Sequence, residues 1–167
     1  MIIKLLLILT LSLIFFQDIK ERMVWLFLLP SFAILGCLLY FWKSNSDIFL
    51  ASILVNIGIV GVLMLVNFLV AKFIFKKNLL KEAIGLGDLL FFIAFALSFP
   101  TLAFLNFFVF SLIFSFLVHQ LALVISKRKG KITQKHSRVP LAGLMAFFLI
   151  GVYSAHWLGF YNSIYLM

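Results

Sequence analysis

Residues 86–125 read LGDLLFFIAFALSFPTLAFLNFFVFSLIFSFLVHQLALVI, a continuous apolar tract of about 40 residues. A transmembrane helix needs roughly 20 apolar residues, so this tract is about twice as long as one span requires. It must therefore fold back on itself, and the candidate turns are Phe99-Pro100-Thr101 and the neighbourhood of Asn106. The tract predicts two antiparallel transmembrane helices, at about 86–103 and 105–125.

Four further apolar segments, at about 2–17, 24–42, 48–71 and 140–160, extend the pattern to the whole chain. With 65% hydrophobic and 11% charged residues, the chain has too few polar groups to cover a soluble domain of this size. Membrane β-strands alternate over roughly 10 residues, whereas these apolar runs are much longer. The sequence thus predicts an all-α bundle of about six transmembrane helices, forming one domain over residues 1–167 in a lipid bilayer.

The first apolar segment resembles a secretory signal, because Lys4 precedes a long apolar run. No small-x-small cleavage pattern follows that run, which ends in Phe15-Phe16-Gln17-Asp18. We therefore expect the segment to remain as the first helix.

The basic residues indicate how the bundle is oriented. Two of the 14 lie in or near predicted outer segments, at Lys4 and Lys43, and the others lie in three loops on the opposite side. Those others are Lys20, Arg22, Lys72, Lys76, Lys77, Lys81, Lys127, Arg128, Lys129, Lys131, Lys135 and Arg138. Cytoplasmic loops gather Lys and Arg, so we predict a multi-pass protein of the cytoplasmic (inner) membrane with both termini outside. The same rule explains the net charge of +9 without nucleic acid as a partner, since no soluble basic domain is present.

The chain has five acidic residues, and two of them stand apart. Asp47 precedes the third predicted helix, where capping explains it, and Glu21 and Glu82 lie among lysines in predicted loops. Asp18 and Asp88 lie on the same predicted side, at the end of the first helix and the start of the fourth. An ionisable group within the membrane is costly, so each should face the bundle interior or a wet cleft.

Two facing carboxyl groups can hydrolyse a peptide bond without a metal or a nucleophilic side chain. The ionised member takes a proton from water, while the protonated member polarises the carbonyl and later protonates the leaving amine. Gly85 and Gly87 precede Asp88 directly, and glycines allow another backbone to approach closely. The sequence therefore suggests Asp18 and Asp88 as catalytic residues and the two glycines as a place for substrate backbone. No metal or cofactor is expected.

Three stretches resemble the prepilin peptidases, the GxGD aspartyl proteases of type IV pilus and related secretion systems. Residues 18–25 (DIKERMVW) are similar to the family's D-x-[KR]-x-R-x-I-P stretch, residues 85–88 (GLGD) match GxGD, and residues 139–143 (VPLAG) approximate I-P-F-G-P. Trp25 and Leu90 depart from the family's usual proline and lysine. The methyltransferase portion of longer members has no counterpart here, so the resemblance is to the short form.

This resemblance implies a membrane-embedded endopeptidase that cleaves the leader of a prepilin-like or pseudopilin-like substrate at the cytoplasmic membrane face. Two alternatives stay open. A presenilin-like or signal-peptide-peptidase-like protease also uses GxGD, although its first aspartate lies in the helix immediately before that motif. The other alternative is a non-enzymatic membrane scaffold or an inactive homologue.

The predicted orientation can be tested by cysteine labelling. In a Cys37→Ala background, Ser44→Cys should react with an impermeant maleimide applied outside, and Ser126→Cys should react only after the membrane is opened. Labelling of both positions from outside would overturn the orientation and the cytoplasmic placement of the two aspartates.

Overall fold

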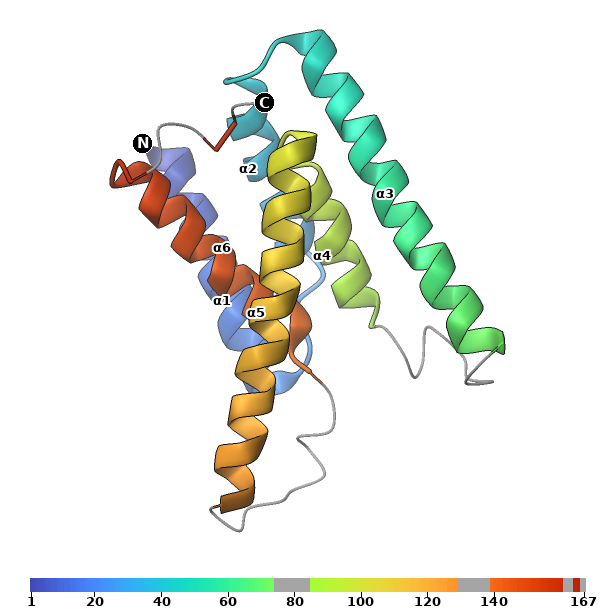
Figure 1. Cartoon of the computed structure of the whole chain (residues 1–167). Coiled ribbons are helices and arrows are strands. Elements are labelled where there is room, and N and C mark those ends of the chain that lie inside the picture. Colours follow the sequence, from blue (N-terminus) through green and yellow to red (C-terminus); the bar gives the residue numbers. More distant parts are fainter. Residues whose placement is uncertain (74–84, 129–138, 161–163, 166–167) are drawn as a thin grey trace.

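The computed structural model describes residues 1–73, 85–128, 139–160 and 164–165. The described residues form six helices and no strand, which confirms the predicted all-α bundle (Figure 1). The helices are α1 (Ile2–Glu21), α2 (Leu28–Phe41), α3 (Ser46–Phe73), α4 (Leu86–Ala96), α5 (Thr101–Arg128) and α6 (Leu141–Trp157).

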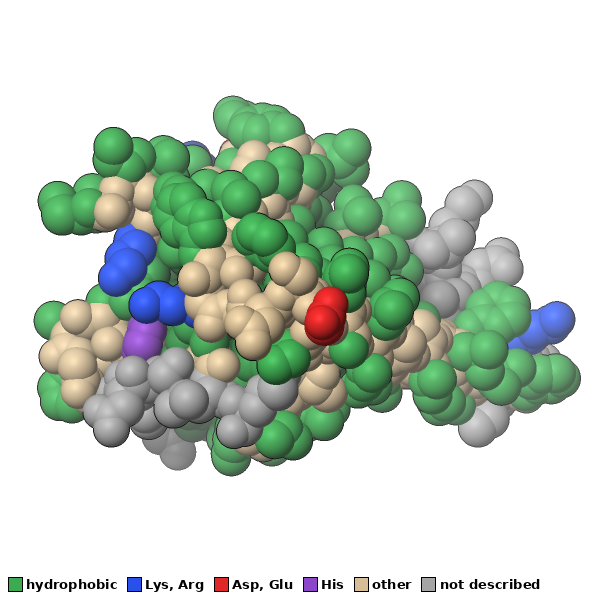
Figure 2. Space-filling view, turned by 90° about the horizontal axis from the view of Figure 1, so that it is seen from above, with side chains coloured by type: hydrophobic (Ala, Val, Ile, Leu, Met, Phe, Trp, Pro, Cys, Tyr) green, Lys and Arg blue, Asp and Glu red, His purple; other side chains and the backbone are tan. Residues whose placement is uncertain are grey.

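The helices differ in length, and three of them are long and apolar enough to cross a membrane. These are α1, α3 and α5, whereas α2, α4 and α6 are apolar but have only 14, 11 and 17 residues. The start of α1 and the end of α6 lie at the same end of the molecule (Figure 1). Viewed onto that end, the surface is largely hydrophobic, with a few basic side chains (Figure 2). Such apolar helices and surface indicate a membrane protein.

The fold-back within the 86–125 tract occurs at Pro100. Helix α4 ends at Ala96, α5 begins at Thr101, and the Phe104 N–H donates to the Pro100 carbonyl at 2.8 Å. Asn106 lies inside α5, so a turn at that residue is wrong. The predicted fourth helix, 86–103, is correspondingly too long.

An aromatic cluster holds the α4–α5 hairpin together. The buried Phe95 ring meets those of Phe99, Phe104 and Phe108 edge-on, with ring centroids 5.4–5.8 Å apart. Such pairs add about 0.5–1.5 kcal/mol each beyond the apolar area that they bury. Just beyond the end of α4, α2 approaches the turn closely at Gly36, where an added Cβ would collide with the Ser98 hydroxyl. Helix α4 therefore packs against α5 through this cluster, and the turn that follows it packs against α2.

Helix α3 diverges from the other helices along much of its length (Figure 1). One fully buried polar side chain, Asn56, links it to the α4–α5 turn. The Asn56 amide donates to the carbonyls of Ala96 and Phe99, at 2.9 Å each. These carbonyls are at and just beyond the C-terminal end of α4, where the helix itself supplies no donors. Asn56 therefore caps α4 from the neighbouring helix.

We predict that Asn56→Ala lowers the free energy of unfolding by about 1–2 kcal/mol, because two buried carbonyls lose their donor. Asn67→Ala is the matched control on α3, since Asn67 is exposed and donates to Leu63 of its own helix. Thermal unfolding in detergent would compare the two variants. Equal losses would show that Asn56 does not anchor α3.

Candidate active site

Asp18 lies on the face of α1 that packs against α6. The buried residues Leu7, Leu11 and Ile14 recur at helical spacing, and Asp18 is the next position on the same stripe. The side chain is 7% exposed. One turn away, Phe15 of α1 stacks on Phe147 of α6 with centroids 4.9 Å apart. Packing of the apolar stripe thus carries the carboxyl group into the α1–α6 interface.

Asp88 continues the buried stripe of α4 in the same way. It lies in the first turn, ahead of the buried Phe91, Phe92 and Phe95, and is itself half-buried. Its carboxyl group lies close to Gly85 at the start of the helix, where a Cβ on Gly85 would be 3.5 Å from Asp88 Oδ2. An acid in the first turn lies at the positive end of the helix dipole, so Asp88 also favours the beginning of α4.

The two carboxyl groups meet at the start of α6. The Ala142 N–H donates to Asp88 Oδ1 at 3.1 Å, and the Gly143 N–H donates to Asp18 Oδ2 at 2.6 Å. The first amides of a helix have no partner within the helix, and the positive end of the helix dipole favours negative charge there. The two carboxyl groups are close enough to interact electrostatically. The structure therefore brings together two predicted catalytic residues that lie far apart in the sequence.

The segment after Asp18 is held close to the end of α1. The backbone N–H of Arg22 donates to the backbone carbonyl of Asp18 at 3.1 Å. The backbone N–H of Trp25 donates to Gln17 Oε1, also at 3.1 Å. Arg22 also interacts electrostatically with the Asp18 carboxyl. Arg22 has φ 58° and ψ 22°, the left-handed conformation that commonly ends helices but is usually given to glycine.

The two glycines predicted to lie along substrate occupy the start of α4. Gly85 is exposed and extended, with φ −70° and ψ 148°, and a Cβ there would lie 3.5 Å from Asp88 Oδ2. Gly87 has open space where a Cβ would be. Neither has a positive φ, so the backbone conformation itself does not require glycine at either position. A contact with substrate backbone stays a prediction.

The remaining acids take no part in this site as far as the structure describes them. Glu21 is exposed at the end of α1, and Asp47 lies in the first turn of α3 rather than before the helix. Glu82 lies outside the described residues. Within the described ranges, no three His, Cys, Asp or Glu side chains form a cluster that could hold a metal ion.

Sequence reasoning missed the role of Ala142 and Gly143. Both lie in the 139–143 stretch, but they act through backbone N–H groups, which no side-chain pattern reveals. A signal was nevertheless present: Ala142, Ala146 and Leu149 are spaced as one face of a helix, and Gly143 stands beside the first of them.

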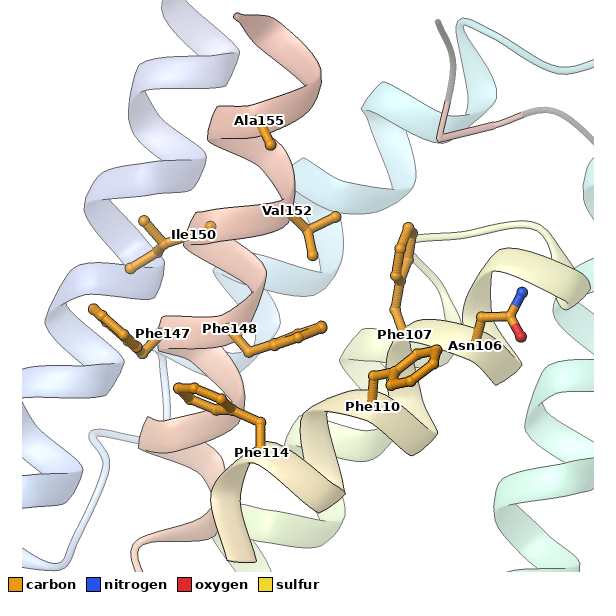
Figure 3. Close-up of a pocket in the computed structure, with 10 residues that line it drawn as sticks. Asn106, Phe107, Phe110, Phe114, Phe147, Phe148, Ile150, Val152 and Ala155 are labelled. Carbon is orange, nitrogen blue, oxygen red and sulfur yellow. The ribbon is translucent and has the colours of Figure 1, made fainter. Parts of the chain in front are cut away.

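A separate groove of about 880 Å³ opens between α5 and α6 (Figure 3). Its walls are almost entirely aromatic and aliphatic, with Phe110, Phe114, Phe147 and Phe148 prominent and Asn106 at one end. None of the described residues that line it has a titratable side chain.

Comparisons with protein-family models, with curated proteins and with solved structures found no match. The motifs and the geometry of the two aspartates are therefore the features that point to a function.

The left-handed turn at Arg22 allows a test of this geometry. Arg22→Gly and Arg22→Ala both remove the charge near Asp18, but only glycine removes the steric cost of positive φ, about 1 kcal/mol. We expect Arg22→Gly to be the more stable of the two variants by about that amount in detergent unfolding experiments. Equal stability would mean that residue 22 does not adopt this conformation in the folded protein.

Proposed function

We propose that this protein is a membrane-embedded aspartyl endopeptidase that cleaves the leader of type IV prepilin-like substrates at the cytoplasmic membrane face. The observation that carries the proposal is the meeting of Asp18 and Asp88 at two successive amides of α6. Two carboxyl groups from distant segments, converging where three helix ends come together, form the arrangement that aspartyl proteolysis needs.

The chemistry uses the aspartate pair alone. One carboxylate accepts a proton from water as the water oxygen bonds to the scissile carbonyl carbon, and the protonated partner donates to the carbonyl oxygen. Collapse of the tetrahedral intermediate breaks the C–N bond, and the leaving nitrogen takes up a proton from the pair. Close like charges make the two groups share one proton, which supplies one acid and one base at the start of the cycle.

The location of the pair fits a substrate that enters from the membrane. Asp18 lies at the C-terminal end of α1, and Asp88 lies at the N-terminal end of α4. These ends adjoin the loops rich in Lys and Arg, which we predict to be cytoplasmic. A leader peptide that precedes an apolar helix would present its cleavage site at this depth.

A specific observation also favours the scaffold alternative. Each carboxyl group already accepts a backbone N–H bond, and such bonds alone would suffice to tie α1 and α4 to α6. Under that alternative the aspartates are structural caps. Replacing the acids with neutral residues of the same shape separates the two functions.

We predict that Asp18→Asn and Asp88→Asn each reduce cleavage of a prepilin-type substrate by about 10²–10⁴-fold, the range of general acid–base catalysis. The double variant should be scarcely worse than either single one, because residues that act as a unit lose function non-additively. A reconstituted assay with purified protein and a prepilin peptide in detergent would measure the rates.

Asp47→Asn and Glu82→Gln are the controls and should retain most activity, since Asp47 is exposed in the first turn of α3 and Glu82 is predicted to be solvated. Membrane insertion and unfolding temperature of all variants would be compared in parallel. Near wild-type cleavage by Asp88→Asn would reject the peptidase and leave the scaffold.

A further inference from the structure

We propose that the first turn of α6 positions the aspartate pair, and that Gly143 is the positioning residue because the site has no room for a side chain there. The effect on catalysis rests on the proposed peptidase function. The geometry itself can be tested without any enzymatic assay.

The spacing of the two donors sets the spacing of the two acids. Ala142 and Gly143 are neighbours in the chain, so their amide nitrogens are separated by one peptide unit. Each nitrogen donates to a different carboxyl group. The start of α6 therefore sets the positions of both carboxyl groups, and its positive end favours the negative charge that the pair carries.

The contact at Gly143 excludes every residue with a side chain. A Cβ added there would lie 2.8 Å from the Asp18 Cβ, 3.3 Å from its Cγ and 3.0 Å from its Oδ2. The nearest of these atoms, the Asp18 Cβ, is attached directly to the α1 backbone, so rotation of the side chain cannot relieve that contact. Either α1 moves away from α6, or Asp18 leaves its hydrogen bond.

The first of these outcomes, a movement of α1 away from α6, is opposed by packing between the two helices. Phe15 of α1 stacks on Phe147 of α6 one turn from the contact, and the α1 stripe of Leu7, Leu11 and Ile14 is fully buried. We therefore expect the Asp18 carboxyl group to leave its hydrogen bond to Gly143 before α1 and α6 separate. A displacement of about 1 Å at a catalytic group can cost on the order of 100-fold in rate.

NMR tests the two hydrogen bonds directly. In full-length protein labelled with ¹⁵N-glycine and ¹⁵N-alanine, Asp18→Asn should shift the Gly143 amide and leave the Ala142 amide nearly unchanged. Asp88→Asn should do the reverse, and Asp47→Asn should shift neither. Nine glycines give few resonances, and the signal lost in Gly143→Ala identifies the one of interest. Failure of the Gly143 amide to respond to Asp18→Asn would overturn the proposal.

Steady-state kinetics test whether the proposed loss of alignment between the two acids lowers the rate of cleavage. Gly143→Ala should lower kcat by about 100-fold with KM changed less than about twofold, because alignment of the acids and not substrate binding is lost. Gly151→Ala is the matched control on the same helix, since its added Cβ meets open space, and it should keep wild-type kcat. A Gly143→Ala variant as active as Gly151→Ala would refute the positioning role.

The two proposals fail separately. If wild-type protein does not cleave prepilin substrates but the crossed amide shifts are observed, the peptidase function is wrong and the positioning of the two acids stands. If wild-type protein cleaves but the amides do not respond, the peptidase function stands and the positioning by α6 is wrong.

Discussion

Two backbone-to-carboxylate hydrogen bonds at the start of α6 connect three helices that the sequence keeps far apart. In a bilayer, apolar surfaces gain little by leaving lipid for one another, so packing and polar links determine which helices associate. Asp18 and Asp88 supply such links at one end of the bundle, and Asn56 supplies another near the opposite end of α4. Burying these acids is costly. Unpartnered amides and the positive end of α6 offset part of that cost.

Much of the architecture follows from composition and periodicity. The 86–125 tract is too long for one span, so a hairpin is required, and the structure contains one. The sequence does not distinguish Pro100 from Asn106 as the position of the turn, because both interrupt an apolar run. Tertiary contacts distinguish them: the buried aromatic cluster around Phe95 closes only if the chain turns at Pro100.

The candidate site was only partly predictable, and the reason is physical. Side-chain chemistry marked Asp18 and Asp88, since isolated acids in an apolar chain need an explanation. Ala142 and Gly143 have no side-chain functional group. They matter because their N–H groups point at the two carboxyl groups and because Gly143 has no Cβ. Both properties exist only once α1 and α6 are packed together. Periodicity placed each residue on a helix face but gave no indication of which faces would meet.

The shortness of α4 has a consequence for the surrounding lipid. Its 11 residues rise only about 16 Å, roughly half the thickness of a hydrocarbon core. A hydrophobic stretch shorter than the hydrocarbon core is accommodated in part by local thinning of the bilayer. Asp88 stands in the first turn of that helix. Local thinning would therefore bring the aqueous phase closer to Asp88, and in the proposed peptidase it would supply the water molecule that hydrolysis consumes.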